Sequence, residues 1–274
     1  MISCESLFCN WYAYRKGKKP RWDVAVFEHD LEKNIIALHH DLRTGAYRHG
    51  PYTAFYTQEP KRRCIHKASV RDRLVHHMLY HGLVARVDRV FIDQSYASRV
   101  GKGVHAAVKA VARHLRQVSR NHTRPVYALQ CDIEHFFATV DHETLLRLIA
   151  RWVPDERLRR LLTVVIQSFE TAPGKGMPIG TITAQVCANI YLNALDQYIK
   201  RVLRCRYYAR YMDDFILLSD NYQYLQDCLV AIRSFLRSTL HLRLHPQKVS
   251  IRSYKTGLDW LGYLLLPQYS LVRR

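Results

Sequence analysis

Long apolar runs are missing from this sequence. No stretch approaches the roughly 20 residues that a membrane-spanning helix needs. The first residues also lack a basic segment followed by an apolar one, so we expect no signal peptide, no membrane partner and a cytoplasmic location. Internal repeats, low-complexity tracts and Gly/Ser-rich linkers are absent as well, which excludes a repeat architecture.

Paired cysteines are missing too. The seven cysteines are odd in number, scattered along the chain and without a Cys-x-x-Cys pair. This distribution argues against a disulfide framework or a zinc ribbon and favours reduced thiols.

Acidic residues are scarce relative to basic ones. The 274 residues include 23 Asp and Glu against 42 Lys and Arg, a net charge of +19, and the excess runs through the whole chain. A charge of this size indicates a polyanionic partner, and nucleic acid fits better than a membrane surface. With 48% hydrophobic residues, the chain is long enough to bury a substantial core in one or two lobes.

Periodicity and turn residues predict a mixed helical and strand structure. Residues 1–23 form a basic and aromatic segment that we expect to be loose or ordered by a partner. The expected helices cover residues 24–43, 70–88, 104–120, 181–203 and 222–240, with further helices from near Asp141 and Asp155. The expected strands cover residues 126–132, the hairpin 206–219, 249–253 and 260–266.

Three acidic residues stand at the ends of apolar runs. Asp213 and Asp214 lie in the run Tyr211-Met-Asp-Asp214, a tight turn between two apolar segments, and Asp132 ends another apolar run. Adjacent carboxylates repel unless a cation neutralises them. Three hard oxygen donors on neighbouring strands suit two Mg²⁺ ions about 3.5–4 Å apart, an arrangement that drives nucleotidyl transfer. Asp141 is interpreted differently, as the N-cap of the next helix.

Seven motifs occur in the order found in reverse transcriptases, and together they span roughly residues 24–266. They are Lys61-Arg-Arg63 with Arg71-Asp-Arg73; Asp93 to His105; Asp132-Ile-Glu-His-Phe-Phe137; Gly176 to Gln185; Tyr211-Met-Asp-Asp214; His245-Pro-Gln-Lys248; and Trp260-Leu-Gly-Tyr263. The chain therefore resembles a reverse transcriptase, an RNA-directed DNA polymerase.

The resemblance implies an α+β fold, a right-hand polymerase with fingers and a split βαβ, ferredoxin-like palm. It places the fingers at residues 24–125, the palm at 126–250, and the end of the palm with a truncated thumb connection at 251–274. We expect the thumb to be short or absent, so that the chain alone has poor processivity.

The resemblance also implies roles for the site residues. Asp132, Ile133, Asp213 and Asp214 would hold two Mg²⁺ ions, for which Mn²⁺ can substitute. Phe137 occupies the family's steric-gate position, where a bulky ring collides with a ribose 2′-hydroxyl; packing in the core is the alternative. Lys248 is a candidate proton donor to pyrophosphate, with a solvated surface charge as the alternative.

Further residues are expected to contact nucleotides. Lys61 and Arg63 suit triphosphate oxygens. Arg73 matches a family position but could instead pair with Asp72 or another nearby carboxylate. The resemblance also implies nucleotide contacts for five residues of the fourth and fifth motifs, within the predicted palm: Ile179, Gly180, Gln185, Tyr211 and Met212.

One departure indicates the subfamily. Most reverse transcriptases carry Gln-Gly-x-x-x-Ser-Pro at the fourth motif, whereas this chain has Ile179-Gly-Thr-Ile-Thr-Ala-Gln185. This is similar to diversity-generating retroelement enzymes of bacteria, archaea and phages, with Ala184 replacing the usual Ser. Those enzymes make cDNA with errors opposite template adenine and work with a small basic homopentameric accessory protein. Ile179 offers the incoming nucleotide packing but no hydrogen bond, so geometric checking should be weaker.

Two alternatives stay open at this point. One is a group II intron-like or retron-like reverse transcriptase, against which the missing Gln at position 179 argues. The other is a catalytically weak RNA-binding scaffold. The intact carboxylates favour an enzyme whose partners are template RNA, the primer or cDNA strand and deoxynucleoside triphosphates.

Overall fold

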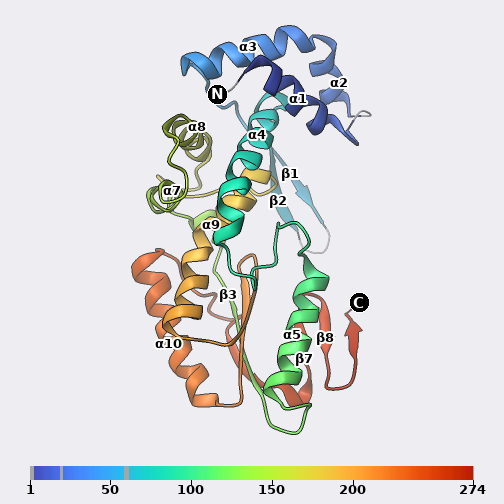
Figure 1. Ribbon diagram of the computed structural model, residues 1–274, viewed down its shortest axis with the longest axis vertical. Coiled ribbons are helices and arrows are strands. Elements are labelled where there is room, and N and C mark those ends of the chain that lie inside the picture. Colours follow the sequence, from blue (N-terminus) through green and yellow to red (C-terminus); the bar gives the residue numbers. More distant parts are fainter. Residues whose placement is uncertain (1–2, 19–20, 59–61, 274) are drawn as a thin grey trace. The chain divides into compact units, whose positions relative to one another are not determined.

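The computed structural model describes residues 3–18, 21–58 and 62–273. The chain forms two compact units, each made of two segments (Figure 1). One unit comprises Met1–Val87 and Leu146–Cys187, and the other comprises Asp88–Leu145 and Ala188–Arg274. No helix in the described ranges is both long and apolar enough to cross a bilayer. All seven cysteines are free thiols.

The first unit is mainly helical. Its helices are α1 (Cys4–Arg15), α2 (Trp22–His29), α3 (Leu31–Thr44), α4 (Val70–Val87) and α8 (Glu156–Gln167). An antiparallel hairpin, β1 (Thr53–Thr57) and β2 (Arg63–Lys67), completes it. Helix α7 (His142–Ala150) leads into this unit, and α9 (Ile182–Gln197) leads out of it.

The prediction of a loose N-terminal segment was wrong for helix α1. Ser3 and Ser6 form a capping box at its start, which satisfies backbone N–H groups of the first turn. Leu7, Trp11 and Tyr14 follow at helical spacing and are buried, and the helix contacts α3 and α4. Apolar residues such as Cys9 and Tyr12 are exposed on other faces of the helix, so the sequence shows no clear helical period there.

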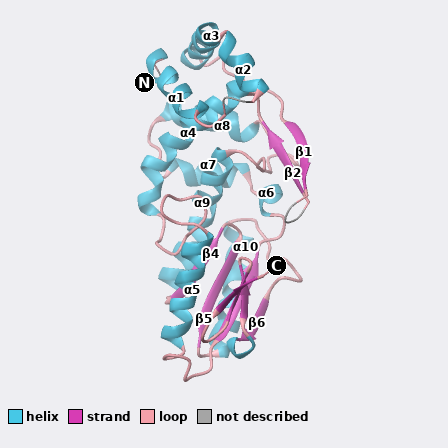
Figure 2. Ribbon diagram, turned by 90° about the vertical axis from the view of Figure 1, so that its right-hand side faces the viewer, coloured by secondary structure: helices cyan, strands magenta, loops and turns pink. Residues whose placement is uncertain are grey.

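The second unit is built on a four-stranded antiparallel sheet in the order β4-β5-β3-β6 (Figure 2). Its strands are β3 (Tyr127–Asp132), β4 (Tyr207–Tyr211), β5 (Asp214–Ser219) and β6 (Ser250–Ser253). The predicted strand at 126–132 and the predicted hairpin at 206–219 are confirmed. A smaller sheet follows, made of β7 (Leu258–Trp260), β8 (Tyr263–Leu265) and β9 (Ser270–Val272).

Helices cover the sheet of the second unit. Helix α5 (Val104–Val118) packs against β4 and β5, and α10 (Tyr222–Thr239) packs against β3 and β5 (Figure 1). Short turns of helix at α6 (Phe136–Thr139) and Tyr198–Val202 join these elements.

Alternation along the strands decides which side chains share a face. Ala128 and Leu218 are register partners and belong to the core cluster that includes α5 and residues of β7 and β8. Side chains two and four positions along a strand point the same way. Asp132 and Asp214 therefore lie on this face of the sheet, and Gln130 Nε2 on the same face donates to the Asp259 carbonyl in β7 at 2.7 Å.

Candidate active site

The two strands β3 and β5 bring Asp132 and Asp214 together. The residues are direct register partners in the antiparallel ladder, although 82 positions separate them in the sequence (214 − 132). Asp213 precedes Asp214 in the turn between β4 and β5. The three predicted carboxylates thus belong to one end of one sheet.

Lys248 reaches the same place through the turn that starts at His245. The His245 N–H donates to the Asp132 carbonyl at 2.8 Å, which fixes the turn beside the end of β3. Lys248 Nζ then donates to Asp132 Oδ2 at 2.9 Å. Lys248 is half-exposed but holds an ion pair with a site carboxylate, so it is not simply a solvated charge.

Electrostatics at this end of the sheet favour a bound cation. The pKa of Asp214 is raised to about 7, first by burial and then by the nearby Asp213 and Asp132 carboxylates, with Lys248 opposing them. The lysine is therefore not enough to neutralise the cluster. Oxygen donors in this setting suit a divalent metal, whose double charge would displace the retained proton.

The carboxylates do not yet form a ligand set. Among the described residues, no three His, Cys, Asp or Glu side chains are grouped so that they could hold a metal ion as they stand. The chemistry of the donors fits a divalent ion. Ile133 is buried, so only its backbone could serve as the predicted ligand.

The two phenylalanines of the motif Asp132-Ile-Glu-His-Phe-Phe137 differ in burial. Phe136 is buried and contacts Tyr191, with ring centroids 6.3 Å apart. Phe137 is half-exposed and stands edge-on to Phe136 at 5.4 Å. The burial pattern supports the distinction between a core ring and a ring available to substrate. Asp141 caps α7 as predicted, because its Oδ1 accepts from the Thr144 N–H at 2.8 Å.

In the first unit, the loop at the start of α9 lies beside strand β2. The Ile179 carbonyl accepts from the His66 N–H at 2.8 Å. Gly180 has a φ of +111°, and a Cβ there would lie 2.6 Å from Ile65 Cγ2. Only glycine fits both the backbone conformation and the space. Gln185 is half-buried in the first turn of α9.

The predicted phosphate-binding residues have different surroundings. Lys61 lies outside the described residues. Arg63 is exposed at the start of β2. Arg73 forms an ion pair with Asp23 rather than with Asp72, whose carboxylate accepts hydrogen bonds from Tyr47 and Ser69.

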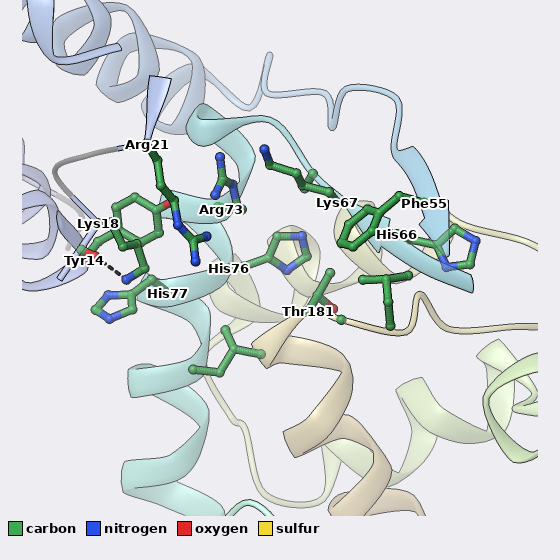
Figure 3. Close-up of a pocket in the computed structure, with 14 residues that line it drawn as sticks. Tyr14, Lys18, Arg21, Phe55, His66, Lys67, Arg73, His76, His77 and Thr181 are labelled. Atoms are coloured by element: carbon green, nitrogen blue, oxygen red, sulfur yellow. Dashed lines mark hydrogen bonds between the residues drawn. The ribbon is translucent and has the colours of Figure 1, made fainter. Parts of the chain in front are cut away.

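A cavity of about 320 Å³ lies beside Arg73 and Gly180 (Figure 3). Lys18, Arg21 and Lys67 also line it, so four cationic side chains surround one space. Asp23 is bound to both Lys67 and Arg73. Figure 3 shows Arg21 and Lys18 near Tyr14, with Lys67 beside Phe55.

Polar groups of the cavity lining are left unsatisfied. Among the described residues, Tyr14 Oη, His66 Nδ1 and Arg73 Nε are buried without a hydrogen-bond partner. Burial lowers the pKa of Lys18, and Arg21 and Arg73 lower it further. Crowded cations and unpaired polar atoms together favour an anionic ligand with further hydrogen-bonding groups.

Sequence reasoning missed several of these residues. Lys18, Arg21 and Lys67 belong to no motif that we recognised. The basic run that begins at Arg15 was the available signal for Lys18 and Arg21, and Lys67 had none. Arg210, which donates to the Met212 carbonyl in the turn between β4 and β5, was also missed. An arginine within an apolar strand was the signal for that residue.

Residues 57–265 match the family model described as reverse transcriptase (RNA-dependent DNA polymerase). The chain belongs to the reverse transcriptase family. Members of this family use divalent metal ions, in agreement with the chemistry of the carboxylate cluster. The prediction of an RNA-directed DNA polymerase is confirmed at this level, and the diversity-generating subtype stays a prediction.

Two curated relatives show how far the similarity extends. Protein YkfC of Escherichia coli (strain K12) is 24% identical over 280 residues, which cover 88% of this chain and 73% of YkfC. The group II intron-encoded protein LtrA of Lactococcus lactis subsp. cremoris is 24% identical over 207 residues, covering 72% of this chain and 33% of LtrA.

Solved telomerase structures share the fold. A truncated apo telomerase from Candida tropicalis superposes with a TM-score of 0.59 at 10% identity, covering 83% of this chain and 55% of that one. A telomerase from Candida albicans, solved with a fragment of telomeric RNA, gives 0.59 at 10% identity, covering 84% and 48%. This chain thus spans about half of each telomerase chain. The predicted α+β polymerase fold is confirmed.

Proposed function

We propose that this reverse transcriptase copies a template RNA into error-prone cDNA, as diversity-generating retroelement enzymes do. The observation that carries the polymerase part is the pairing of Asp132 with Asp214 across β3 and β5, with Lys248 bound to the same carboxylate cluster. The observation behind the subtype is the run from Ile179 to Gln185.

Each residue at the end of the sheet has a proposed part in the reaction. Asp132, Asp213, Asp214 and the Ile133 carbonyl would hold the divalent ions, which when bound activate the primer 3′-hydroxyl and neutralise the triphosphate. Lys248 would donate a proton to the leaving pyrophosphate. Its ammonium group would be free to do so if Asp132 bound a metal ion in place of Lys248.

Substrate selection is assigned to both units. Phe137 excludes a ribose 2′-hydroxyl, since it is the half-exposed ring of its pair. In the first unit, the basic cavity takes the phosphate of a nucleotide, with Arg21 and Arg73 as its cations and Phe55 beside the base.

Ile179 is proposed to weaken discrimination opposite adenine. Its backbone is fixed by the bond from His66, so the side chain is presented in one place with no hydrogen-bonding group. We expect Ile179→Gln to lower misincorporation opposite template adenine by about two- to tenfold, the value of one net hydrogen bond. Ile36→Gln, at an exposed position of α3 outside the cavity lining, is the matched control. An unchanged error spectrum in Ile179→Gln would refute the assignment.

A second candidate function is favoured by the similarity to LtrA, a group II intron-encoded protein. In that case the enzyme would copy RNA accurately. The two candidates therefore differ in fidelity rather than in chemistry.

Primer extension on an adenine-containing RNA template, followed by sequencing of the products, separates these functions. The reaction is run with and without a small basic homopentameric accessory protein, the partner expected for the diversity-generating subtype. Errors concentrated at adenine support the proposal, and accurate product supports the intron-like enzyme. RNA binding without any DNA product would favour the alternative of a catalytically weak RNA-binding scaffold.

A further inference from the structure

Arg210 is a fully buried arginine three residues before Asp213. It lies in β4, and the segment around Ser95 covers this edge of the strand: the Arg210 N–H donates to the Gln94 carbonyl at 2.9 Å, and the Tyr96 N–H donates to the Arg210 carbonyl at 3.0 Å. Its partner Asp196, in α9, is also fully buried. Burying a charged pair is costly unless its hydrogen-bonding capacity is fully used.

The Arg210 guanidinium uses all of its donors. Nε and Nη2 donate to the two Asp196 carboxylate oxygens at 2.8 and 2.7 Å. Nη2 also donates to Ser95 Oγ at 2.9 Å, and Nη1 donates to Asn189 Oδ1 at 3.2 Å and to the Met212 carbonyl at 3.0 Å. A guanidinium has five N–H groups, so none is left over.

The bond to Met212 links this network to the catalytic turn. Met212 has a left-handed backbone with a φ of +54°, a conformation that is unfavourable for a residue with a Cβ atom. The Met212 carbonyl and the Asp213 N–H belong to the same planar peptide. A hydrogen bond that fixes the Met212 carbonyl therefore also fixes the orientation of the Asp213 backbone N–H.

A buried ion pair that only held the core together would not need this contact. Tyr208, two residues before Arg210 in β4, already donates its hydroxyl to Asp196 Oδ1 at 2.7 Å. Burial alone would lower the pKa of Arg210, but Asp196 outweighs it, with a smaller contribution from Asp213, and the pKa is raised. The guanidinium thus stays charged under the carboxylates.

We propose that Arg210, anchored by Asp196, is a positioning residue that holds the Met212 turn and so places Asp213 for metal binding. The inference rests on the proposed metal role of Asp213. Arg210 touches neither substrate nor metal in this account, and it acts through the backbone of the turn.

Two variants test the proposal, with Mn²⁺ affinity of the free protein as the readout, measured by electron paramagnetic resonance. Arg210→Lys keeps the buried charge beside Asp196 but cannot also reach Met212 with a planar fork. Arg210→Met combined with Asp196→Leu removes the buried charge altogether and retains packing. Arg15→Met is the matched control, because Arg15 is a half-buried arginine that is paired with Glu28 in the first unit and has no partner in the Arg210 network.

We expect both variants to remain folded and to bind Mn²⁺ about tenfold more weakly, the effect of losing a residue that orients a metal ligand. Arg15→Met should bind Mn²⁺ as the wild type does. The Mg²⁺ concentration for half-maximal nucleotide incorporation should rise in the same two variants, with primer–template affinity unchanged.

Wild-type Mn²⁺ affinity in both variants would overturn the proposal. Loss of folding in both would overturn it too, because the pair would then hold the core rather than the turn. A wild-type protein that binds Mn²⁺ but makes no DNA fails the proposed function alone, whereas one that binds no Mn²⁺ overturns both.

Discussion

Asp214 shows how the carboxylate cluster affects both stability and function. Its pKa is raised from 3.8 to about 7, first by burial and then by the neighbouring carboxylates. The folded state therefore holds a proton that the unfolded state has released between these two values. The contribution of Asp214 to the free energy of unfolding therefore falls as the pH rises through this window and is lowest above pH 7.

Thermal unfolding in the presence of a chelator tests this consequence. We expect the midpoint to fall between about pH 4 and pH 7 more steeply for the wild type than for Asp214→Asn, because the variant lacks the titrating group. Adding Mg²⁺ at pH 8 should restore stability to the wild type and not to Asp214→Asn. Parallel curves for the two proteins would show that Asp214 keeps an ordinary pKa.

Phe137 and Phe136 provide a matched pair of substitutions. Phe137→Ala should admit ribonucleotides with little loss of stability, since the ring is half-exposed. Phe136→Ala should instead destabilise the protein by about 3–5 kcal/mol, since this ring is buried. The measurement is incorporation of ribo- and deoxynucleoside triphosphates, together with denaturant unfolding. Continued rejection of ribonucleotides by Phe137→Ala would remove the gate assignment.

At the scale of elements, the loop before α9 depends on its contact with β2. Gly180 combines a positive φ with a close approach to Ile65, whereas Gly174 has a positive φ and open space. Gly180→Ala should therefore lower the free energy of unfolding by more than the strain of about 1 kcal/mol, and it should also reduce nucleotide incorporation. Gly174→Ala carries only the strain. Equal effects in unfolding and incorporation assays would show that the contact with Ile65 is unimportant.

The elements differ in how far the sequence predicts them. Strand β3 and the β4–β5 hairpin follow from apolar runs that end at carboxylates, and α5 follows from a clear helical period. Helix α1 was missed because apolar residues lie on several of its faces and hide the helical period, and the β1–β2 hairpin was missed because several β1 side chains are exposed. The motifs predicted Asp132, Asp213 and Asp214, but tertiary contacts such as Arg210 to Ser95 or Arg73 to Asp23 leave no local pattern.

At the scale of the whole molecule, the net charge of +19 is the dominant electrostatic feature. Binding of single-stranded RNA should weaken steeply with salt, with a slope of about 0.7 per phosphate contacted. We expect Arg21→Gln to reduce the slope by about 0.7, because Arg21 lines the basic cavity.

Arg160→Gln is the control for this prediction. It removes the same charge from an exposed pair with Glu156 on α8, away from the cavity lining. Affinity measured over a range of salt concentrations gives the slope for each protein. Equal slopes for the two variants would mean that the cavity does not contact RNA.

The most direct test of the polymerase site is single-nucleotide extension of a DNA primer on an RNA template. The wild type is compared with Asp132→Asn, Asp213→Asn and Asp259→Asn, the last an acidic residue of the same unit that is paired with Arg273. We expect extension that requires a divalent ion, a loss of about 100-fold or more for Asp132→Asn and Asp213→Asn, and full activity for Asp259→Asn. Extension that survives at the wild-type rate in either of the first two variants would contradict the assignment of the carboxylate cluster as the catalytic site.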